Sequence, residues 1–283
     1  MGSKGRVAAE PTPGSPPLTL LYEREDLPAA ELPAPLMELY GGGLALTPPV
    51  TFANFVTSLD GVVALSERRH SGTAISGRSQ ADRFVMGLLR AMSDCVLIGA
   101  ETLRAEGDRA LWTPEFIDPE RAAAFASLRR RLGRRPQVRL VVVTATGRLD
   151  ASAAALQAGA LLLTTEPAAA ALAERLPACR VVGVGEGPRL DPARILDAVR
   201  EEGLEAVLLE GGPTLFGQIL DAGLVEQLFL TISPVAAGRE AGAHRLGLVE
   251  GAAFSPELFR WWELLSLRRA GSHLFARYRI QGA

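Results

Sequence analysis

Short apolar runs rich in β-branched residues alternate along most of the chain with longer segments of helical spacing, and this alternation constrains the fold most. The apolar runs predict strands at residues 50–56, 95–98, 140–143, 160–163, 180–184 and 206–209. Helices are predicted at residues 79–92, 120–132, 167–176, 192–202 and 213–221. Alternating strands and helices favour an α/β fold of three layers, with a mostly parallel central sheet between helices.

Both ends of the chain depart from this alternation. Residues 225–232, 261–268 and 273–280 predict strands, and because no convincing helix separates the last two, we expect C-terminal antiparallel additions to one edge of the sheet. Residues 1–17 are rich in proline and small residues and predict a flexible tail. A single folded domain is therefore expected over residues 18–283.

Charge and composition favour a small-molecule partner. The chain is 48% hydrophobic and 22% charged, with 30 basic residues against 32 acidic ones, as in ordinary globular proteins. A net charge of −2 gives no overall positive field to attract nucleic acid. The densest basic run, Arg129 to Arg131 with Arg134 and Arg135, is interpreted as a solvated helix end and loop.

Cysteine usage and the lack of long apolar runs indicate a cytoplasmic protein with no membrane association. Cys95 and Cys179 each adjoin an apolar run, which predicts buried, reduced thiols. No stretch approaches the roughly 18 apolar residues of a membrane span, and the N-terminal segment lacks the apolar core of a signal peptide. The histidines, His70, His244 and His273, are isolated from other metal-ligand residues, so no metal site is expected.

The sharpest local motif is Glu210-Gly211-Gly212-Pro213-Thr214-Leu215, which follows an apolar strand and begins a helix. Glycines allow a backbone to approach a phosphate closely, and a helix N-terminus offers free amides with partial positive charge. The motif predicts a pyrophosphate site, although a plain strand-to-helix turn favours the same residues. A second strand leaves at Gly99 into a helix with Thr102 near its start, and the carboxyl ends of parallel strands share one edge of the sheet.

Two other segments carry polar residues suited to a substrate. Asn54, Thr57, Ser58 and Asp60 follow or end a strand, and they can orient a pyrimidine or a ribose, or else bond the backbone of their own turn. In the helix at 79–92, Ser79 is a suitable N-cap, and Arg90 lies beside the apolar stripe, as a ligand-binding or a snorkelling arginine.

Several familiar motifs are missing or incomplete. Residues 183–188 resemble a dinucleotide fingerprint, but Pro188 stands where the third glycine or alanine belongs, so we discount them. The sequence contains no G-x-x-x-x-G-K-[ST] loop and no G-x-S-x-G elbow, which disfavours phosphoryl transfer from a nucleotide and serine-based hydrolysis.

Together these motifs resemble, in type and order, the 5-amino-6-(5-phosphoribosylamino)uracil reductases of bacterial riboflavin biosynthesis, a family like the RibD C-terminal domain. The motifs are Asn54 with Ser58-Leu59-Asp60-Gly61, then Leu89-Arg90-Ala91 with Gly99 and Thr102-Leu103-Arg104-Ala105, then Glu210-Gly211-Gly212-Pro213-Thr214-Leu215. The resemblance covers about residues 50–280. It implies a dihydrofolate reductase-like fold, a homodimer formed through edge strands, and NADPH-dependent reduction of the ribosyl group of a 5-phosphoribosylamino-pyrimidine to ribityl.

The resemblance also implies roles for individual residues. Asp60 and Glu210 would orient the substrate or assist protonation, and Asn54, Ser58 and Arg90 would bind it. The expected NADPH contacts are Gly99, Thr102, Glu106, Thr144, Thr164, Gly211, Gly212, Pro213, Thr214 and Leu215.

One departure from the family pattern bears on the substrate. Relatives continue after the second motif with Asp-Asp-Pro, a leucine and an arginine, whereas this chain reads Ala105-Glu106-Gly107-Asp108-Arg109. Glu106 is a candidate replacement for the cofactor-contacting carboxylate, and Arg109 for the missing cation. Two alternatives stay open: a reductase of another pterin, pyrimidine or small carbonyl compound, and a nucleotide-binding module without catalysis.

Overall fold

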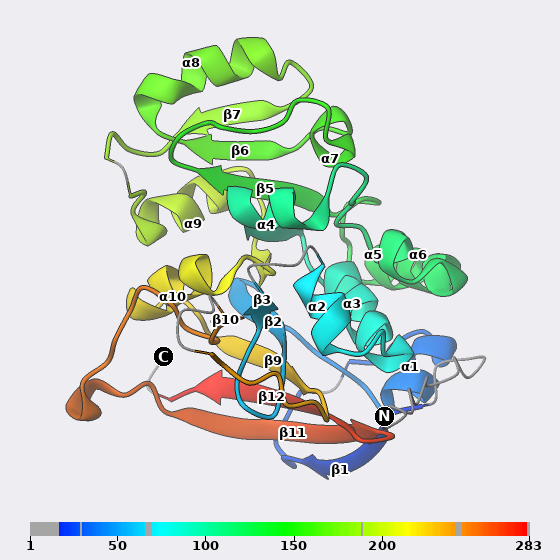
Figure 1. Ribbon diagram of the computed structural model, residues 1–283. Coiled ribbons are helices and arrows are strands. Elements are labelled where there is room, and N and C mark those ends of the chain that lie inside the picture. The colour runs from blue at the N-terminus through cyan, green and yellow to red at the C-terminus, as the bar shows by residue number, and fades with distance from the viewer. Residues whose placement is uncertain (1–16, 29, 66–69, 188, 241–244, 282–283) are drawn as a thin grey trace, which may run out of the picture.

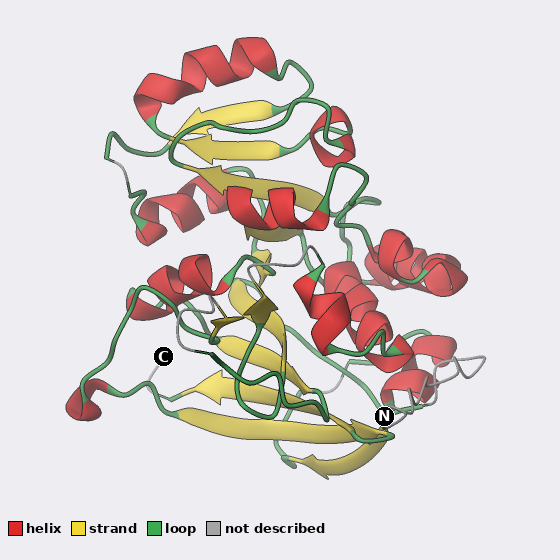
Figure 2. Ribbon diagram, in the orientation of Figure 1, coloured by secondary structure: helices red, strands yellow, loops and turns green. Residues whose placement is uncertain are grey.

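A ten-stranded sheet in the order β1-β11-β12-β9-β2-β8-β4-β5-β6-β7 runs through the molecule (Figure 1). The structure is a computed structural model that describes residues 17–281, apart from residues 29, 66–69, 188 and 241–244. The expected tail at 1–17 therefore lies almost wholly outside the described residues. Figure 2 shows the strands in one continuous layer with helices along both sides of it.

The parallel part of the sheet contains every predicted strand of the alternating region. Its strands are β2 (Val50–Thr57), β4 (Cys95–Gly99), β5 (Arg139–Thr144), β6 (Leu161–Thr164), β7 (Arg180–Gly183) and β8 (Ala206–Leu209). Most of their side chains are buried because helices cover both faces, which explains why these strands are apolar at successive positions.

The predicted helices form the two outer layers. They are α3 (Gln80–Met92), α6 (Ala122–Arg131), α8 (Glu166–Arg175), α9 (Pro192–Glu201) and α10 (Pro213–Asp221). Apolar residues of α3, α6 and α8 belong to the core on one face of the sheet, and those of α9 and α10 to the core on the other. The Ser79 side chain accepts a hydrogen bond from the Asp82 amide, which confirms Ser79 as the N-cap of α3.

The expectation of three antiparallel C-terminal strands is confirmed for two of them and wrong for the third. β11 (Trp262–Ala270) and β12 (His273–Ile280) pair antiparallel, but β9 (Gln227–Ile232) runs parallel to β2 and antiparallel to β12. The reason is α10, which carries the chain back across the sheet between β8 and β9, so that the two strands flank β2 in the same direction.

The structure contains further short elements that the sequence analysis did not identify individually. They are β1 (Thr19–Glu23), α1 (Ala34–Tyr40), β3 (Ala64–Leu65), α2 (Ser71–Ile75), α4 (Ala100–Glu106), α5 (Pro114–Ile117), α7 (Ala154–Gln157), β10 (Arg245–Leu246) and single 3₁₀ turns at Pro119–Arg121 and Pro256–Leu258. Only the helix after Gly99, here α4, had been expected. The helices among these elements have at most seven residues, which is too few turns to show a period.

The arginine run at the end of α6 is exposed at Arg130, Arg131 and Arg135, as interpreted, but the interpretation was wrong for Arg129 and Arg134. The Arg129 guanidinium is buried and donates to the carbonyl oxygens of Arg90, Ala91 and Ser93, at 3.2, 3.2 and 2.7 Å. Its burial lowers the pKa of Arg129 to about 10. Arg134 forms an ion pair with Asp94. The unpaired carbonyls at the C-terminus of α3 favour a buried cation there.

The thiols of Cys95 and Cys179 are both buried and free, as expected from their apolar neighbours. Within the residues that the structure describes, we find no helix of the length and apolar character needed to cross a membrane.

Candidate active site

Two adjoining pockets lie where several parallel strands end and their helices begin. The larger has a volume of about 510 Å³ and lies between α4 and α10; the smaller, of about 220 Å³, is lined largely by α2, α3 and the end of β2. The two pockets share lining residues at a junction, namely Ala64, Ser71, Thr102, Ala105, Gly212 and Pro213. They therefore form one continuous cleft at the edge of the sheet where open α/β folds bind ligands.

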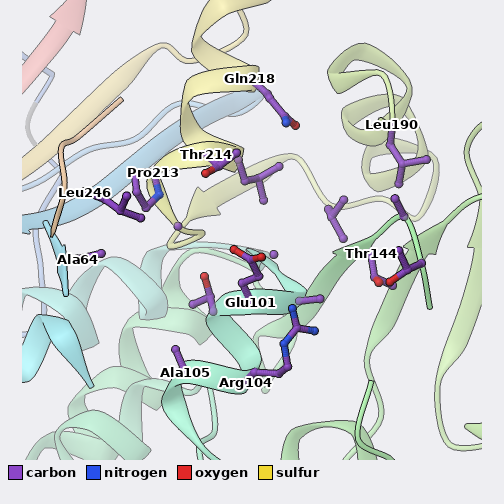
Figure 3. Close-up of a pocket in the computed structure, with 18 of the residues that line it drawn as sticks. Ala64, Glu101, Arg104, Ala105, Thr144, Leu190, Pro213, Thr214, Gln218 and Leu246 are labelled. Atoms are coloured by element: carbon purple, nitrogen blue, oxygen red, sulfur yellow. The ribbon is translucent and has the colours of Figure 1, made fainter. Parts of the chain in front are cut away.

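The Gly-Gly-Pro turn forms one wall of the larger pocket. Gly212 is the N-cap of α10 and provides no side-chain cap, so the first-turn amides have no acceptor within the helix. A Cβ on Gly212 would lie 3.5 Å from the Thr102 hydroxyl, in the space between the two turns. Figure 3 shows Pro213 and Thr214 of α10 across the pocket from Glu101 and Arg104 of α4. The arrangement leaves room for a group that contacts backbone directly.

The opposite end of the larger pocket lies beyond β5. Thr144 and Leu190 are at this end in Figure 3, and Arg189 also lines the pocket. The side chain of Arg104 reaches into the space between α4 and the end of β5 (Figure 3). The ribbon formed by β3 and β10 closes the other end through Ala64 and Leu246. An elongated ligand can therefore extend from the junction with the smaller pocket to Thr144 and Leu190.

The structure brings most of the predicted cofactor residues together. Those that line the larger pocket are Gly99, Thr102, Thr144, Gly212, Pro213, Thr214 and Leu215. Gly211 and Glu106 instead line the smaller pocket, where the Glu106 carboxylate lies 2.9 Å from His70 Nδ1. Thr164 is fully buried at the end of β6 and lines neither pocket.

A buried ion pair dominates the smaller pocket. The Arg90 guanidinium donates to both carboxylate oxygens of Glu210, with Nη2–Oε2 at 2.7 Å and Nε 3.1 Å from each oxygen. The two side chains are 5% and 8% exposed. Arg90 Nη1 also donates to the carbonyls of Leu111 and Thr113, each at 3.3 Å. Arg90 is therefore an inward-facing residue of the cleft rather than a snorkelling one, and Glu210 is fixed beside the Gly-Gly-Pro turn.

Asn54 is the third predicted substrate residue that lines the smaller pocket, and it comes from β2. The rest of the wall is mainly apolar and includes Val56, Met86, Trp112 and Phe116. A few polar groups among apolar side chains are typical of a small-molecule site.

The sequence analysis missed one carboxyl group in this wall. Asp82, in the first turn of α3, lines the smaller pocket and is 6% exposed. Burial raises the pKa of Asp82 to about 6, although hydrogen bonding with Thr231 and Ser76 and the charge of His273 act in the opposite direction. The helical spacing 82, 85, 89, 92 places Asp82 on the same stripe as buried Val85, Leu89 and Met92, which is the signal that would have indicated its burial.

Ser58 and Asp60 do not join these residues. Asp60 accepts hydrogen bonds from the Ser58 hydroxyl and from the amides of Ala237 and Gly238, at 2.7, 2.8 and 2.7 Å. These donors lower the pKa of Asp60 to about 2. Neither residue lines the larger or the smaller pocket. The geometry is that of the turn interpretation, in which the two side chains hold the backbone around them.

Arg109 is also absent from both pocket walls, whereas its neighbours Ala110, Leu111 and Trp112 line the smaller one. Among the residues that the structure describes, Arg90 is the cation that lines the smaller pocket, and it is already paired with Glu210.

Comparison with known proteins shows that the chain is similar to reductases of riboflavin biosynthesis. The model of the RibD C-terminal domain family matches residues 49–273. A 2,5-diamino-6-ribosylamino-4(3H)-pyrimidinone 5′-phosphate reductase of Archaeoglobus fulgidus is 23% identical over 192 residues, which is 67% of this chain and 82% of the relative.

Two solved structures share the fold over most of the chain. A pyrimidine reductase-like protein of Corynebacterium diphtheriae has a TM-score of 0.64 and 24% identity, over 88% of this chain and 99% of that one. The riboflavin biosynthesis reductase Rib7 of Saccharomyces cerevisiae has a TM-score of 0.55 and 13% identity, over 85% of this chain and 93% of that one. With the sheet described above, they confirm the expected α/β class with a mostly parallel central sheet and C-terminal antiparallel strands.

Proposed function

The chain belongs to the RibD C-terminal domain family, and we propose that it is an NADPH-dependent reductase that converts the ribosyl group of a 5-phosphoribosylamino-pyrimidine to ribityl. The observation that carries the proposal is the continuous cleft, which joins a long pocket beside an uncapped helix N-terminus to a pocket with buried charges. Hydride transfer requires such an arrangement, because two ligands must meet at one point.

The larger pocket is suited to the cofactor. Its volume lies within the range of ligand pockets, roughly 300–1,000 Å³, and the space a Cβ on Gly212 would fill is the space that a diphosphate needs. Amides of Thr214 and Leu215 in the first turn of α10 would face the diphosphate. The nicotinamide ring, which supplies the hydride when the cofactor is bound, would lie at the junction with the smaller pocket.

The arginines support NADPH over NADH. Arg104 and Arg189 line the larger pocket, and Arg189 directly precedes Leu190, which lies at the end of the pocket away from Ala64 in Figure 3. We expect the adenosine at this end. Guanidinium groups bind phosphate strongly, which suits the 2′-phosphate that distinguishes NADPH. We expect Arg189→Ala to reduce the preference for NADPH over NADH by roughly tenfold, as measured from the two dissociation constants.

The smaller pocket would bind the substrate. Arg90 and Glu210 form a fixed charged surface next to the junction, and Asn54 adds an amide that can both donate and accept hydrogen bonds. We assign these three residues to substrate orientation. The ion pair leaves Glu210 with both oxygens engaged, so its role is to hold Arg90 and the substrate rather than to move freely.

The exposed edge strand β1 and the buried thiols bear on the oligomeric state of the protein and on its compartment. β1 is an edge strand with Leu20, Leu21 and Tyr22 exposed by 44%, 50% and 45%, and an exposed apolar edge favours pairing with a second copy. We therefore infer a homodimer formed through this edge. The buried free thiols support a reducing compartment, for which we propose the cytoplasm.

Arg109, the candidate replacement for the arginine of the family pattern, bears on a second class of substrate. Because Arg109 lines neither pocket, a pterin or another small carbonyl compound without a phosphate is the alternative substrate. A module that binds the nucleotide without turnover is the alternative outside enzymes.

Steady-state oxidation of NADPH separates the three readings. The purified protein is mixed with NADPH and the phosphoribosylamino-pyrimidine, and in parallel with the dephosphorylated compound and with dihydropterin and simple carbonyl compounds. We expect the fastest oxidation with the phosphorylated pyrimidine and formation of the ribityl product. Oxidation confined to the other compounds would replace the substrate, and cofactor binding without any oxidation would reject the enzyme.

A further inference from the structure

Two buried carboxyl groups line the smaller pocket, and they differ in what surrounds them. Both oxygens of Glu210 accept hydrogen bonds from Arg90. Asp82 has no such partner: among the ion pairs of the described residues, none involves Asp82. The groups that act on it are the hydroxyls of Thr231 and Ser76, which lower its pKa, and the Ser76 hydroxyl also donates to the carbonyl oxygen of Thr73 at 3.4 Å. A guanidinium can only donate, whereas a hydroxyl can donate or accept, so Asp82 can gain and lose a proton without losing its partners.

The position of Asp82 suits contact with a substrate. Asp82 and Arg90 lie eight residues apart on α3, which corresponds to about 12 Å along the helix axis. Both line the smaller pocket. Ser76, which bonds Asp82, directly follows α2, and α2 begins with Ser71 at the junction with the larger pocket. A substrate held by Arg90 and Glu210 would therefore extend past Asp82.

On this basis we propose that Asp82 is the proton donor of the reduction, a catalytic residue in direct contact with the substrate. The inference rests on the proposed function. As the ring-opened C1′=N group accepts a hydride from the reduced nicotinamide at C1′, its π-electron pair moves to the nitrogen, and the nitrogen takes the proton of the Asp82 carboxyl. Asp82 is left as a carboxylate and regains a proton from solvent.

The electrostatic surroundings agree with a proton donor near neutral pH. Burial raises the pKa of Asp82 to about 6, and the negative charge of Glu210 acts in the same direction. His273 on β12, whose Nε2 lies 3.0 Å from the Ser76 carbonyl oxygen and 3.3 Å from Ser233 Oγ, lowers it when charged. Among the described residues that line the pocket, Arg90 is the cation, and it is neutralised by Glu210, while Glu106 at the end of α4 adds a further carboxylate.

The first test compares the wild type with Asp82→Asn across pH 5–9. If Asp82 donates the proton, the wild-type kcat/KM falls as pH rises above the Asp82 pKa, because only the protonated acid works. Asp82→Asn should lower kcat by about 100-fold or more, with a smaller change in KM, and should abolish that alkaline fall. Asp94→Asn is the matched control, because Asp94 is paired with Arg134 and lines neither pocket.

A second variant tests the same claim through a residue outside the pocket wall. Thr231→Val keeps the side-chain shape but removes a hydroxyl whose hydrogen bond lowers the pKa of Asp82. We expect the alkaline fall in kcat/KM to move to higher pH while the plateau activity stays within about threefold of the wild type. A structural role for Thr231 would change the plateau and leave the pH of the inflexion in place.

Direct titration supplies a readout that needs no turnover. Carbon-13 NMR of aspartate-labelled, cofactor-free protein should show one carboxyl that titrates near pH 6, that disappears in Asp82→Asn and that moves to higher pH in Thr231→Val. The inference is overturned if this carboxyl titrates below pH 5, or if Asp82→Asn retains kcat and the wild-type pH profile. A wild type that never oxidises NADPH would reject the proposed function and this inference together, whereas active Asp82→Asn rejects the inference alone.

Discussion

The two pockets of the cleft are built by different means. The larger one is shaped by main chain, with glycines and helix N-termini from adjacent strand-to-helix turns, and it is also lined by Arg104 and Arg189. The smaller one depends on buried charged side chains, the Arg90–Glu210 pair and Asp82. A pocket lined by backbone can bind its ligand without burying charged side chains, so it changes the free energy of unfolding little. Buried charged side chains can act on the reacting groups of a substrate, but they also affect the free energy of unfolding. Substitutions in the two pockets should therefore have different consequences.

The largest effect is expected from breaking the buried ion pair. Arg90→Met leaves the Glu210 carboxylate 8% exposed without its guanidinium and should lower the free energy of unfolding by about 3 kcal/mol, as measured by urea denaturation. The control is Arg180→Met, which breaks the exposed pair with Glu202 and should cost less than about 1 kcal/mol. The double variant Arg90→Met, Glu210→Met should recover much of the loss. If Arg90→Met and Arg180→Met lowered the free energy of unfolding equally, the assignment of a buried pair would be contradicted.

Gly212→Val tests the larger pocket. The new side chain would occupy the space next to Thr102 without meeting backbone, so we expect the dissociation constant for NADPH to rise at least about 100-fold, or roughly 2.7 kcal/mol. The Tm should change little. Gly72→Ala places a methyl group in the smaller pocket instead, in ordinary contact with Val56, and should leave NADPH affinity unchanged. Unchanged affinity in Gly212→Val, measured by fluorescence titration, would remove the diphosphate from this turn.

Asp82→Asn should make the folded protein more stable at neutral and alkaline pH. The folded-state pKa of about 6 is above the ordinary value of 3.8, so ionisation of Asp82 costs the folded state stability as pH rises between these values. The cost is absent below pH 3.8 and fully present above about pH 6. We expect a gain of about 1–2 kcal/mol at pH 8 and none at pH 3.5, from denaturation at both. If Asp82→Asn were less stable than the wild type at pH 8, the ionised Asp82 carboxylate would be stabilised by hydrogen bonds in the folded state, and this prediction would be wrong.

The smallest effect is expected for Asp60→Asn, outside both pockets. The folded-state pKa of Asp60 is lowered to about 2, so its carboxylate stabilises the fold above pH 3.8, and this contribution is lost as pH falls through about 2. The variant should show a small fall in Tm at pH 7 that vanishes at the acid end, with kcat within about twofold of the wild type. A large loss of kcat with unchanged NADPH affinity would instead support the catalytic role that the sequence suggested.

The larger pocket could be predicted from the sequence better than the smaller one, because its residues form local motifs, whereas the smaller pocket joins residues far apart in the chain. The Gly-Gly-Pro turn is a local signal, because strand, glycines and helix start within a few adjacent residues. The strands were predictable because burial on both faces makes each one an apolar run. The direction of β9 was not predictable, because the residues of β9 do not indicate which neighbouring strand it pairs with.

The smaller pocket depends on contacts between distant parts of the chain. Arg90 and Glu210 are 120 residues apart, so the sequence marked each as a candidate but not as a pair. Asp82 was overlooked because an acidic residue in the first turn of a helix is normally explained by the helix dipole. Its burial results from packing near β9 and β12, which bring Thr231 and His273 towards α3. The turn that holds Asp60 could not be predicted, because its amide donors are 177 and 178 residues away and do not appear in its own motif.

A crystal structure of the protein with NADP⁺ tests the central claim most directly. The account predicts the diphosphate against the first-turn amides of α10 at Gly212, the adenosine towards Arg189, and the nicotinamide at the junction, facing the smaller pocket. A dinucleotide bound elsewhere, or a nicotinamide ring turned away from Arg90 and Glu210, would contradict it.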